Sequence, residues 1–257
     1  MSRLAVVVPV YQEAAGIRPT LEHLAAQHDD DVDVWFVDNG STDGSHAIVE
    51  SFAAARGLAR WRVVHEAQKG TGAAADTGMR AAIAAGATML ARTDADCLPR
   101  RDWTARLRHA MTPREAGGLG IDLVAGLLVP RHDEGLGPVR RAALTAAVRV
   151  ADGFGVVRPA NYGDGMHGLY VMAAGCNVGI TAAMYERAGG FPRTAIEDLH
   201  EDRALVNAVR RIPGSRCVRR DDVVVRGSSR RVRAWGLKNT LLWYKDHAYR
   251  PEHVDIR

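Results

Sequence analysis

The chain has 257 residues, 47% of them hydrophobic and 25% charged, with a net charge of +4, which is the composition of a globular protein with room for one large α/β domain. Its three cysteines, Cys97, Cys176 and Cys217, are odd in number and far apart, so neither a disulfide framework nor a zinc site is expected. Basic residues crowd the last third, which favours an anionic ligand or a membrane surface over general nucleic-acid binding, and the aromatic residues are scattered along the chain rather than forming a platform for bases.

The N-terminus runs at once into the first predicted strand, and this leaves no room for a signal peptide. No apolar stretch approaches the roughly 20 residues that cross a bilayer. We therefore expect a cytoplasmic protein with at most peripheral membrane contact.

The first part of the chain alternates between strand-like and helix-like segments. Short apolar runs predict strands over residues 4–10, 32–37, 61–65 and 88–93. Helical spacing of apolar residues, and a run rich in alanine, predict helices over residues 14–27 and 73–85. Strands that alternate with helices indicate an α/β fold with a doubly wound, mostly parallel sheet and helices on both faces. Such sheets bind their ligands at the carboxyl ends of the strands.

Beyond residue 103 the alternation is less regular. Two further strands are expected over residues 124–130 and 217–226, and helices over residues 182–188, 201–211 and, as an amphipathic stretch, 235–244. Residues 152–167 are rich in glycine and polar side chains, so we expect a mobile loop near the site there. No repeat or linker marks a boundary, and one domain is the better interpretation.

Asp94 and Asp96 follow the fourth predicted strand directly. In an extended backbone, residues i and i+2 project from the same face, so both carboxylates would reach one spot at the sheet's carboxyl edge. Two carboxylates held together repel each other unless a cation lies between them. Oxygen ligands suit Mg²⁺ or Mn²⁺, and such ions usually bridge to substrate phosphates.

Three motifs stand in order at predicted strand ends: VPVYQE from residue 8, VDNGSTD from residue 37, and the Asp94–Asp96 pair. In this order and spacing they resemble the family-two inverting glycosyltransferases, which have the GT-A fold. The resemblance is strong over residues 4–103 and looser to about residue 231.

The resemblance implies a single GT-A-like domain over residues 1–257. About residues 1–103 would bind a nucleotide-sugar donor, and about residues 104–257 an acceptor. The implied reaction moves a sugar, with inversion, from a nucleotide diphosphate to a hydroxyl group of a glycan, a lipid carrier or a small metabolite. Mg²⁺ or Mn²⁺ would assist it.

In that family the loop after the first strand holds the nucleotide, which here gives Pro9, Tyr11 and Glu13 this role. Tyr11 would stack on the base and Glu13 would accept a hydrogen bond from the ribose or the base. Asp38 would hydrogen-bond the base. Many relatives carry a second aspartate where this chain has Asn39, and an amide presents a donor as well as an acceptor, so the base preference stays open.

The resemblance also assigns residues around the phosphates. Asp96 would bind the metal, and Asp94 would reach the ribose or the metal through water. Relatives often place a basic residue inside the alanine-rich helix, and here Lys69, at its entrance, would supply the charge instead. Arg230 and Arg231 would close over the diphosphate from a flexible loop and offset its charge.

Inverting transfer needs one base that takes the proton of the acceptor hydroxyl. The family supplies it from an acidic residue at the start of a helix in the second half, where this chain offers Asp198 and Asp202. We favour Asp202, with Glu201 orienting it or binding acceptor, because the helix-like sequence after it fits the family pattern better. Asn177 would donate to an acceptor hydroxyl.

Other classes of protein share a doubly wound sheet. A dehydrogenase would need Gly-x-Gly-x-x-Gly after the first strand, and a sugar-phosphate nucleotidyltransferase its own glycine-rich phosphate loop in the same turn; neither is present. A non-catalytic sugar-nucleotide-binding protein would keep Asp94 and Asp96 without needing an acidic pair at Glu201 and Asp202. The sequence leaves the binding protein and the nucleotidyltransferase open as alternatives.

Overall fold

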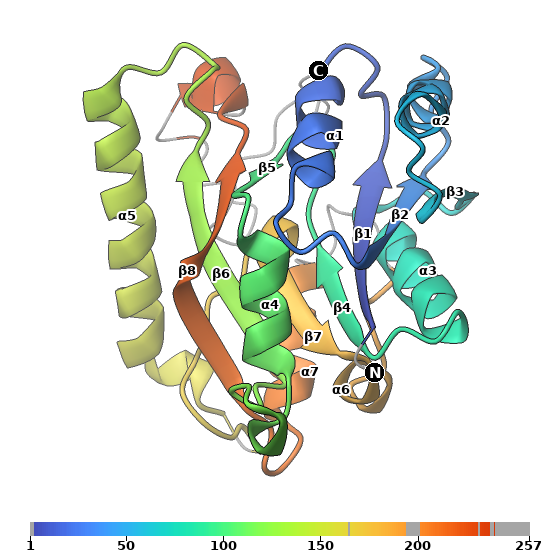
Figure 1. Ribbon diagram of the computed structural model, residues 1–257. Coiled ribbons are helices and arrows are strands. Elements are labelled where there is room, and N and C mark those ends of the chain that lie inside the picture. Colours follow the sequence, from blue (N-terminus) through green and yellow to red (C-terminus); the bar gives the residue numbers. More distant parts are fainter. Residues whose placement is uncertain (1–2, 164, 194–200, 231, 237–238, 240–257) are drawn as a thin grey trace.

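The structure is a computed structural model that describes residues 3–163, 165–193, 201–230, 232–236 and 239. Within these ranges the strands form one eight-stranded sheet in the order β3-β2-β1-β4-β7-β6-β8-β5 (Figure 1). The α/β fold class expected from the alternating pattern is confirmed.

Four parallel strands form the first part of the sheet. They are β1 (Leu4–Val10), β2 (Val32–Asp38), β3 (Trp61–His65) and β4 (Met89–Arg92). The helices that connect them are α1 (Arg18–Ala25), α2 (Ser45–Ala55) and α3 (Thr71–Ala84). Every residue of β2 and β4 is buried, as in strands covered on both faces.

The rest of the sheet is mixed. β7 (Val178–Thr181) lies antiparallel between β4 and β6 (Leu123–Pro130), and β8 (Cys217–Gly227) runs parallel to β6. The two-residue strand β5 (Leu98–Pro99) pairs antiparallel with the end of β8. The remaining short helices are α4 (Trp103–Met111), α6 (Ala182–Arg187), α7 (Glu201–Arg210) and the 3₁₀ turns at Arg114–Ala116, Pro159–Asn161 and Gly175–Asn177.

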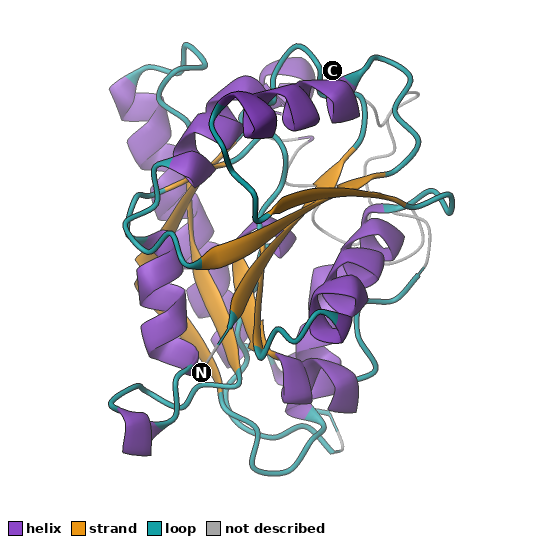
Figure 2. Cartoon of the chain, turned by 45° about the vertical axis from the view of Figure 1, so that its right-hand side comes forward, coloured by secondary structure: helices purple, strands orange, loops and turns teal. Residues whose placement is uncertain are grey.

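Helices cover both faces of the sheet (Figure 2). Along β1, alternate residues enter two separate cores: Val6 packs with the buried residues of α1, α2 and α4, and Val7 with those of α3, α6 and α7. This two-sided cover leaves the carboxyl ends of β1, β2 and β4 as the place where polar loops gather.

One expected element is wrong. Residues 152–157 belong to a 20-residue helix, α5 (Pro138–Val157), rather than to the expected loop. Its two glycines lie near its end, and the first half of the helix, which has strong helix formers, was not singled out from the sequence. Gly155 suits its place because a Cβ there would lie 2.7 Å from the ring of Tyr170, which packs against the helix.

No helix within the described ranges combines the length and the hydrophobicity that a bilayer crossing requires.

Candidate active site

The chain turns sharply directly after β4. The N–H of Cys97 donates to the carbonyl oxygen of Asp94 at 3.0 Å, so residues 94–97 form a turn rather than the extended segment expected from the sequence. Both aspartates still lie at the carboxyl edge of the sheet, with side chains 34% and 28% exposed for Asp94 and Asp96. Burial raises the pKa of Asp94, and the nearby charge of Asp96 raises it further against the lowering effect of Arg92.

Asp96 is joined through Arg230 to Glu13, in the loop after β1. Nη2 of Arg230 lies 2.7 Å from Oδ2 of Asp96 and 2.7 Å from Oε1 of Glu13. Glu13 itself is buried, so the guanidinium is held between two carboxylates from distant parts of the sequence. These carboxylates raise the pKa of Arg230, although burial alone lowers it.

Glu134 fixes the loop that carries Arg230. Its carboxylate accepts hydrogen bonds from the hydroxyls of Ser228 and Ser229, at 2.7 and 2.6 Å. On the other side, Arg131 donates from Nη1 to the carbonyl oxygen of Asp96 at 2.8 Å. The segment directly after β6 therefore holds both the backbone of Asp96 and the loop of Arg230.

The loop after β1 is held in an unusual conformation. Gln12 has a positive φ of 53°, which non-glycine residues rarely adopt. Its side-chain oxygen accepts from the backbone N–H groups of Thr42 and Asp43 at 2.9 and 3.2 Å, and its own N–H donates to the hydroxyl of Ser41. Strained backbone of this kind clusters at ligand sites. Gln12 belongs to the motif VPVYQE, but the motif alone did not indicate this role.

Two residues of the expected nucleotide pocket contact each other. Nζ of Lys69 lies 3.4 Å from the Tyr11 hydroxyl and 5.2 Å from the centre of its ring. Pro9 lies one residue before the end of β1. The cationic end of Lys69 thus stands beside the aromatic face expected to take the base.

Asp38 and Asn39 are both buried at the end of β2, but they differ in use. Asp38 accepts from the N–H of Ser41 at 3.3 Å. The Asn39 amide donates to the carbonyl oxygens of Glu66 and Gln68, at 2.9 and 2.8 Å, and accepts from the N–H of Gly70 at 2.9 Å. Asn39 therefore fastens the loop before α3, a task that an aspartate cannot perform because it lacks the two donors.

A fully buried arginine connects the two halves of the site. Arg92, the last residue of β4, contacts Asp94 at 3.2 Å and Glu201 at 3.3 Å. A Cβ on Gly175 would lie 3.0 Å from its guanidinium, so glycine lets the chain approach closely. The sequence analysis missed Arg92, although an arginine in an otherwise apolar strand two residues before an aspartate was a usable signal.

Asp202 follows Glu201 in the first turn of α7. Its carboxylate accepts from the N–H groups of Arg203 and Gly175, at 2.7 and 3.1 Å. Burial and the neighbouring charge of Glu201 nevertheless raise the pKa of Asp202 to about 6. A carboxylate with such a pKa is suited to take a proton near neutral pH.

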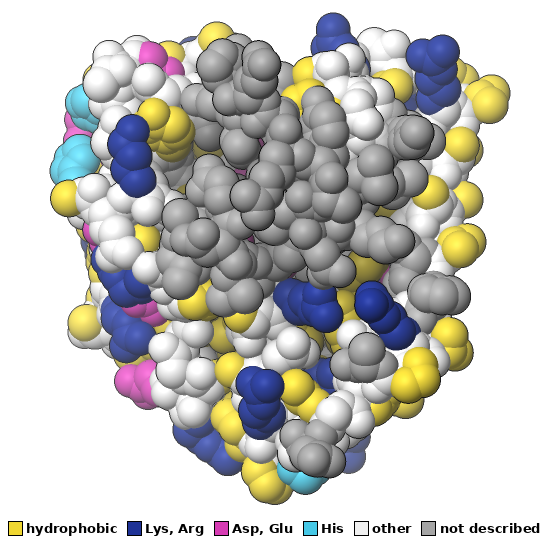
Figure 3. Space-filling model, turned by 180° about the vertical axis from the view of Figure 1, so that it is seen from behind, with side chains coloured by type: hydrophobic (Ala, Val, Ile, Leu, Met, Phe, Trp, Pro, Cys, Tyr) yellow, Lys and Arg dark blue, Asp and Glu magenta, His cyan; other side chains and the backbone are white. Residues whose placement is uncertain are grey.

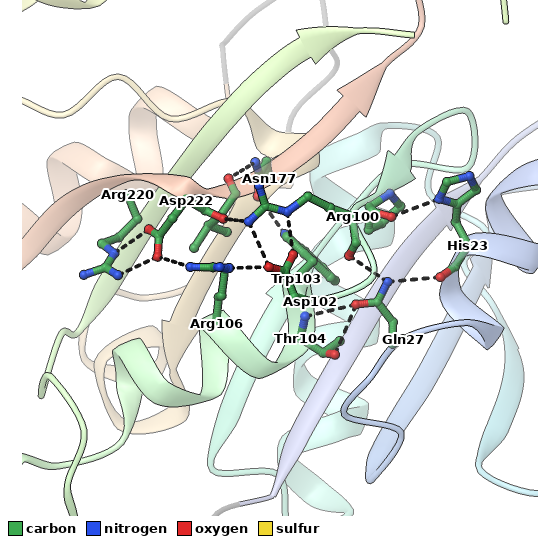
Figure 4. Close-up of polar contacts among 12 residues, drawn as sticks. His23, Gln27, Arg100, Asp102, Trp103, Thr104, Arg106, Asn177, Arg220 and Asp222 are labelled. Carbon is green, nitrogen blue, oxygen red and sulfur yellow. Dashed lines mark hydrogen bonds and ion pairs between the residues drawn. The ribbon is translucent and has the colours of Figure 1, made fainter. Parts of the chain in front are cut away.

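Asn177 does not have the role expected from the sequence. It is fully buried, donates to the carbonyl oxygens of Leu127 and Val223, both at 3.0 Å, and accepts from the indole N–H of Trp103 at 2.8 Å (Figure 4). Both amide protons are used inside the protein, so none is left for an acceptor hydroxyl. The side chain instead ties α4 to β6 and β8.

The residues at the edge fit a hard divalent cation. Asp94 and Asp96 offer carboxylate oxygens, and the guanidinium on Asp96 shows that this carboxylate attracts a positive group. Among the described residues no group of three or more metal-ligating side chains occurs. Two carboxylates match an ion that takes its remaining ligands from phosphates and water.

Two of the predicted site residues, Asp198 and Arg231, lie outside the described residues. The same holds for most of the amphipathic stretch expected over residues 235–244.

Several known proteins are similar to this chain. Residues 5–122 match the family described as Glycosyl transferase family 2. The glycosyltransferase AglE of Haloferax volcanii is 33% identical over 125 residues, which are 48% of this chain and 38% of that protein. The mannosyltransferase PcManGT from Pyrobaculum calidifontis, solved with GDP-Man and Mn²⁺, is 26% identical with a TM-score of 0.61, over 87% of this chain and 56% of that one.

A further solved structure, S. aureus TarS 1–349 in complex with UDP-GlcNAc, is 15% identical with a TM-score of 0.62, over 88% of this chain and 58% of that one. This likeness concerns the fold alone. The chain spans little more than a third of the curated relative and somewhat over half of the two solved structures. Together with the mixed sheet and its acidic edge, these matches show that the chain has the GT-A fold and that its residues 5–122 are similar to glycosyltransferase family 2.

Proposed function

We propose that the protein transfers a sugar, with inversion, from a nucleotide diphosphate to a hydroxyl acceptor, with the help of Mg²⁺ or Mn²⁺. The observation that carries the proposal is the chain of contacts from Asp94 through buried Arg92 to Glu201, next to Asp202. It joins the edge that would hold the donor to a carboxylate with a pKa of about 6. A protein that only bound sugar nucleotides would not need this second carboxylate.

The donor would lie along the ends of β1, β2 and β4. Tyr11, with Lys69 beside it, offers a face for the base, and Asp38 offers a carboxylate at the end of β2. Mannosyltransferase PcManGT was solved with GDP-Man and TarS with UDP-GlcNAc, so the fold itself admits more than one base. We leave the nucleotide and the sugar unassigned.

Asp94 and Asp96 would hold the divalent cation, which when bound offsets the negative charge on the leaving diphosphate. Arg230 would act on the same charge, because its guanidinium already lies at Asp96 and a diphosphate offers stronger acceptors than one carboxylate. Both effects stabilise the negative charge that grows on the diphosphate as its bond to the sugar breaks.

Asp202 would remove the proton from the acceptor hydroxyl as that oxygen attacks the anomeric carbon from the face opposite the diphosphate. Glu201 is bound to Arg92 and would hold the start of α7 in place. A single displacement of this kind inverts the configuration at the anomeric carbon. Glu201 and Arg92 would position the base without touching the reacting atoms.

Calorimetric titration with a panel of sugar nucleotides, with Mn²⁺ and with EDTA, tests donor binding. We expect one nucleotide class to bind, only with the metal, and Asp96→Ala to abolish binding. As control, Asp221→Ala removes a half-exposed carboxylate on β8 and should leave binding unchanged. Equal binding in EDTA would refute the metal role; binding followed by pyrophosphate-dependent nucleotide exchange would identify a nucleotidyltransferase instead.

A further inference from the structure

A hollow lies between α5 and the ends of β6 and β8. It has a volume of about 340 Å³ and is lined by Val129, Pro130, His132, Arg141, Ala142, Thr145 and Arg226. In Figure 1 the first turns of α5 stand next to the upper ends of these two strands. Neither the sequence motifs nor the proposed donor site uses any of these residues.

The hollow carries uncompensated positive charge. No carboxylate among the described residues lies within ion-pairing distance of Arg141 or Arg226, and the lining contains no acidic residue. Three other arginines, after β6, on α5 and on β8, are each paired with an aspartate: Arg131 with Asp133, Arg149 with Asp221, and Arg220 with Asp222. Two unpaired guanidinium groups at one concave surface are an arrangement that an oxyanion stabilises.

The hollow lies close to the reacting edge. Arg226 is the strand partner of Leu98, which comes two residues after Asp96, and it precedes Arg230 by four residues. The Cα atoms of Arg226 and Asp96 are therefore at most about 13 Å apart. On the other wall, Pro130 is followed by Arg131, which donates to the carbonyl oxygen of Asp96.

We propose that this hollow, the Arg141–Arg226 pocket, binds the phosphoryl group of a phosphate-bearing acceptor. The proposal rests on the glycosyltransferase function proposed above. The distance suits a phosphoryl group anchored here while a hydroxyl of the same molecule reaches the donor. Val129, Pro130 and Ala142 form an apolar wall beside the two arginines, so the group next to the phosphate is expected to be short and apolar.

Two kinds of molecule present this chemistry, a small phosphorylated metabolite and a lipid phosphate. On the outer face of α5, Val139, Val150 and Val157 are 80%, 72% and 71% exposed. Exposed apolar side chains suit contact with a lipid surface, so this face favours a lipid phosphate. Hydrophobic side chains follow the right-hand edge of the back view, where the half turn places α5 (Figure 3). The test therefore has one arm for each source.

The first arm measures binding of inorganic phosphate to the whole chain by calorimetry. Arg141→Gln and Arg226→Gln should each weaken phosphate binding about tenfold or more, since each removes charge-assisted hydrogen bonds. Arg149→Gln, on the same helix but paired with Asp221, should leave it unchanged. Equal phosphate binding by wild type and both pocket variants overturns the proposal, and so does loss in the Arg149 control.

The second arm measures cosedimentation with phosphatidylcholine vesicles that contain phosphatidic acid. Binding that both pocket variants lose assigns the phosphate to a lipid; phosphate binding without vesicle binding assigns it to a small metabolite. Donor binding by the variants should stay at the wild-type level. Absence of donor binding in the wild type would refute the proposed transfer reaction. Loss of donor binding in the pocket variants alone would overturn only the proposal that the Arg141–Arg226 pocket is separate from the donor site.

Discussion

Arg230 and Asp96 form an ion pair, with 2.7 Å between Nη2 and Oδ2, at the place where a divalent cation is expected to bind. Two positive groups on one carboxylate repel each other. Donor and metal binding would therefore move the guanidinium from Asp96 to the diphosphate, while Glu13 keeps its own contact with Arg230.

Arg230→Gln tests two roles of the guanidinium, its competition with the metal at Asp96 and its contact with the diphosphate. The variant frees Asp96, so Mn²⁺ should bind more tightly in the absence of donor, while turnover falls about 10- to 100-fold because the diphosphate loses a charged partner. Calorimetry with Mn²⁺ alone and steady-state kinetics measure the two effects. Unchanged Mn²⁺ affinity would show that the ion pair does not compete with the metal.

Asp202→Asn keeps the size of the side chain but removes the proton acceptor. Transfer should fall by roughly 10²–10⁴-fold, while donor and metal binding stay at the wild-type level. Asp221→Asn, on the exposed part of β8, is the matched control. Should the variant transfer at the normal rate, Asp202 is not the base, and Asp198→Asn becomes the variant to examine.

The pH profile of kcat/KM offers an independent check on Asp202. Its pKa is raised to about 6, and only the unprotonated form can take a proton. Activity should be constant above about pH 7 and fall roughly tenfold per pH unit below pH 6. Asp202→Asn should remove this acidic limb. A limb that persists in the variant would belong to another group.

Asn177→Ala should destabilise the fold by about 3 kcal/mol, because it leaves the Trp103 indole N–H and two buried carbonyl oxygens without partners. The midpoint of urea unfolding measures this loss. Asn207→Ala, on α7, replaces an asparagine by a better helix former and should change stability by less than about 0.5 kcal/mol. Similar stability for the two variants would contradict the structural role of Asn177.

The sequence predicted best what depends on local pattern. The third strand was predicted with the bounds that the structure gives it, Trp61–His65, and the parallel order of the first four strands follows from their alternation with helices. The acidic pairs after β4 and at the start of α7 were found because each stands at an element's end, where side chains reach a shared edge.

What depends on distant contacts could not be predicted. The expected role for Asn177 is wrong because three elements brought together by the fold use its amide. The base-reading role for Asn39 stays a prediction, although the Asn39 amide binds the loop before α3. The antiparallel insertion of β7 has no local signal, since four residues fit either direction. Arg230 meets Asp96 across 134 residues of sequence.

The position of β7 limits how the chain can be cut. The family match ends at residue 122, yet β4 has β7 as its second neighbour, and β5 has only β8 within the described residues. A fragment that stopped at residue 122 would expose the unpaired edge of β4, which is a template for aggregation. It would also lose the pairing that holds Leu98, two residues beyond Asp96. The part of the chain up to residue 122 is therefore not a separable module, and chimeras that exchange it between relatives will need β7 and β8 to be exchanged as well.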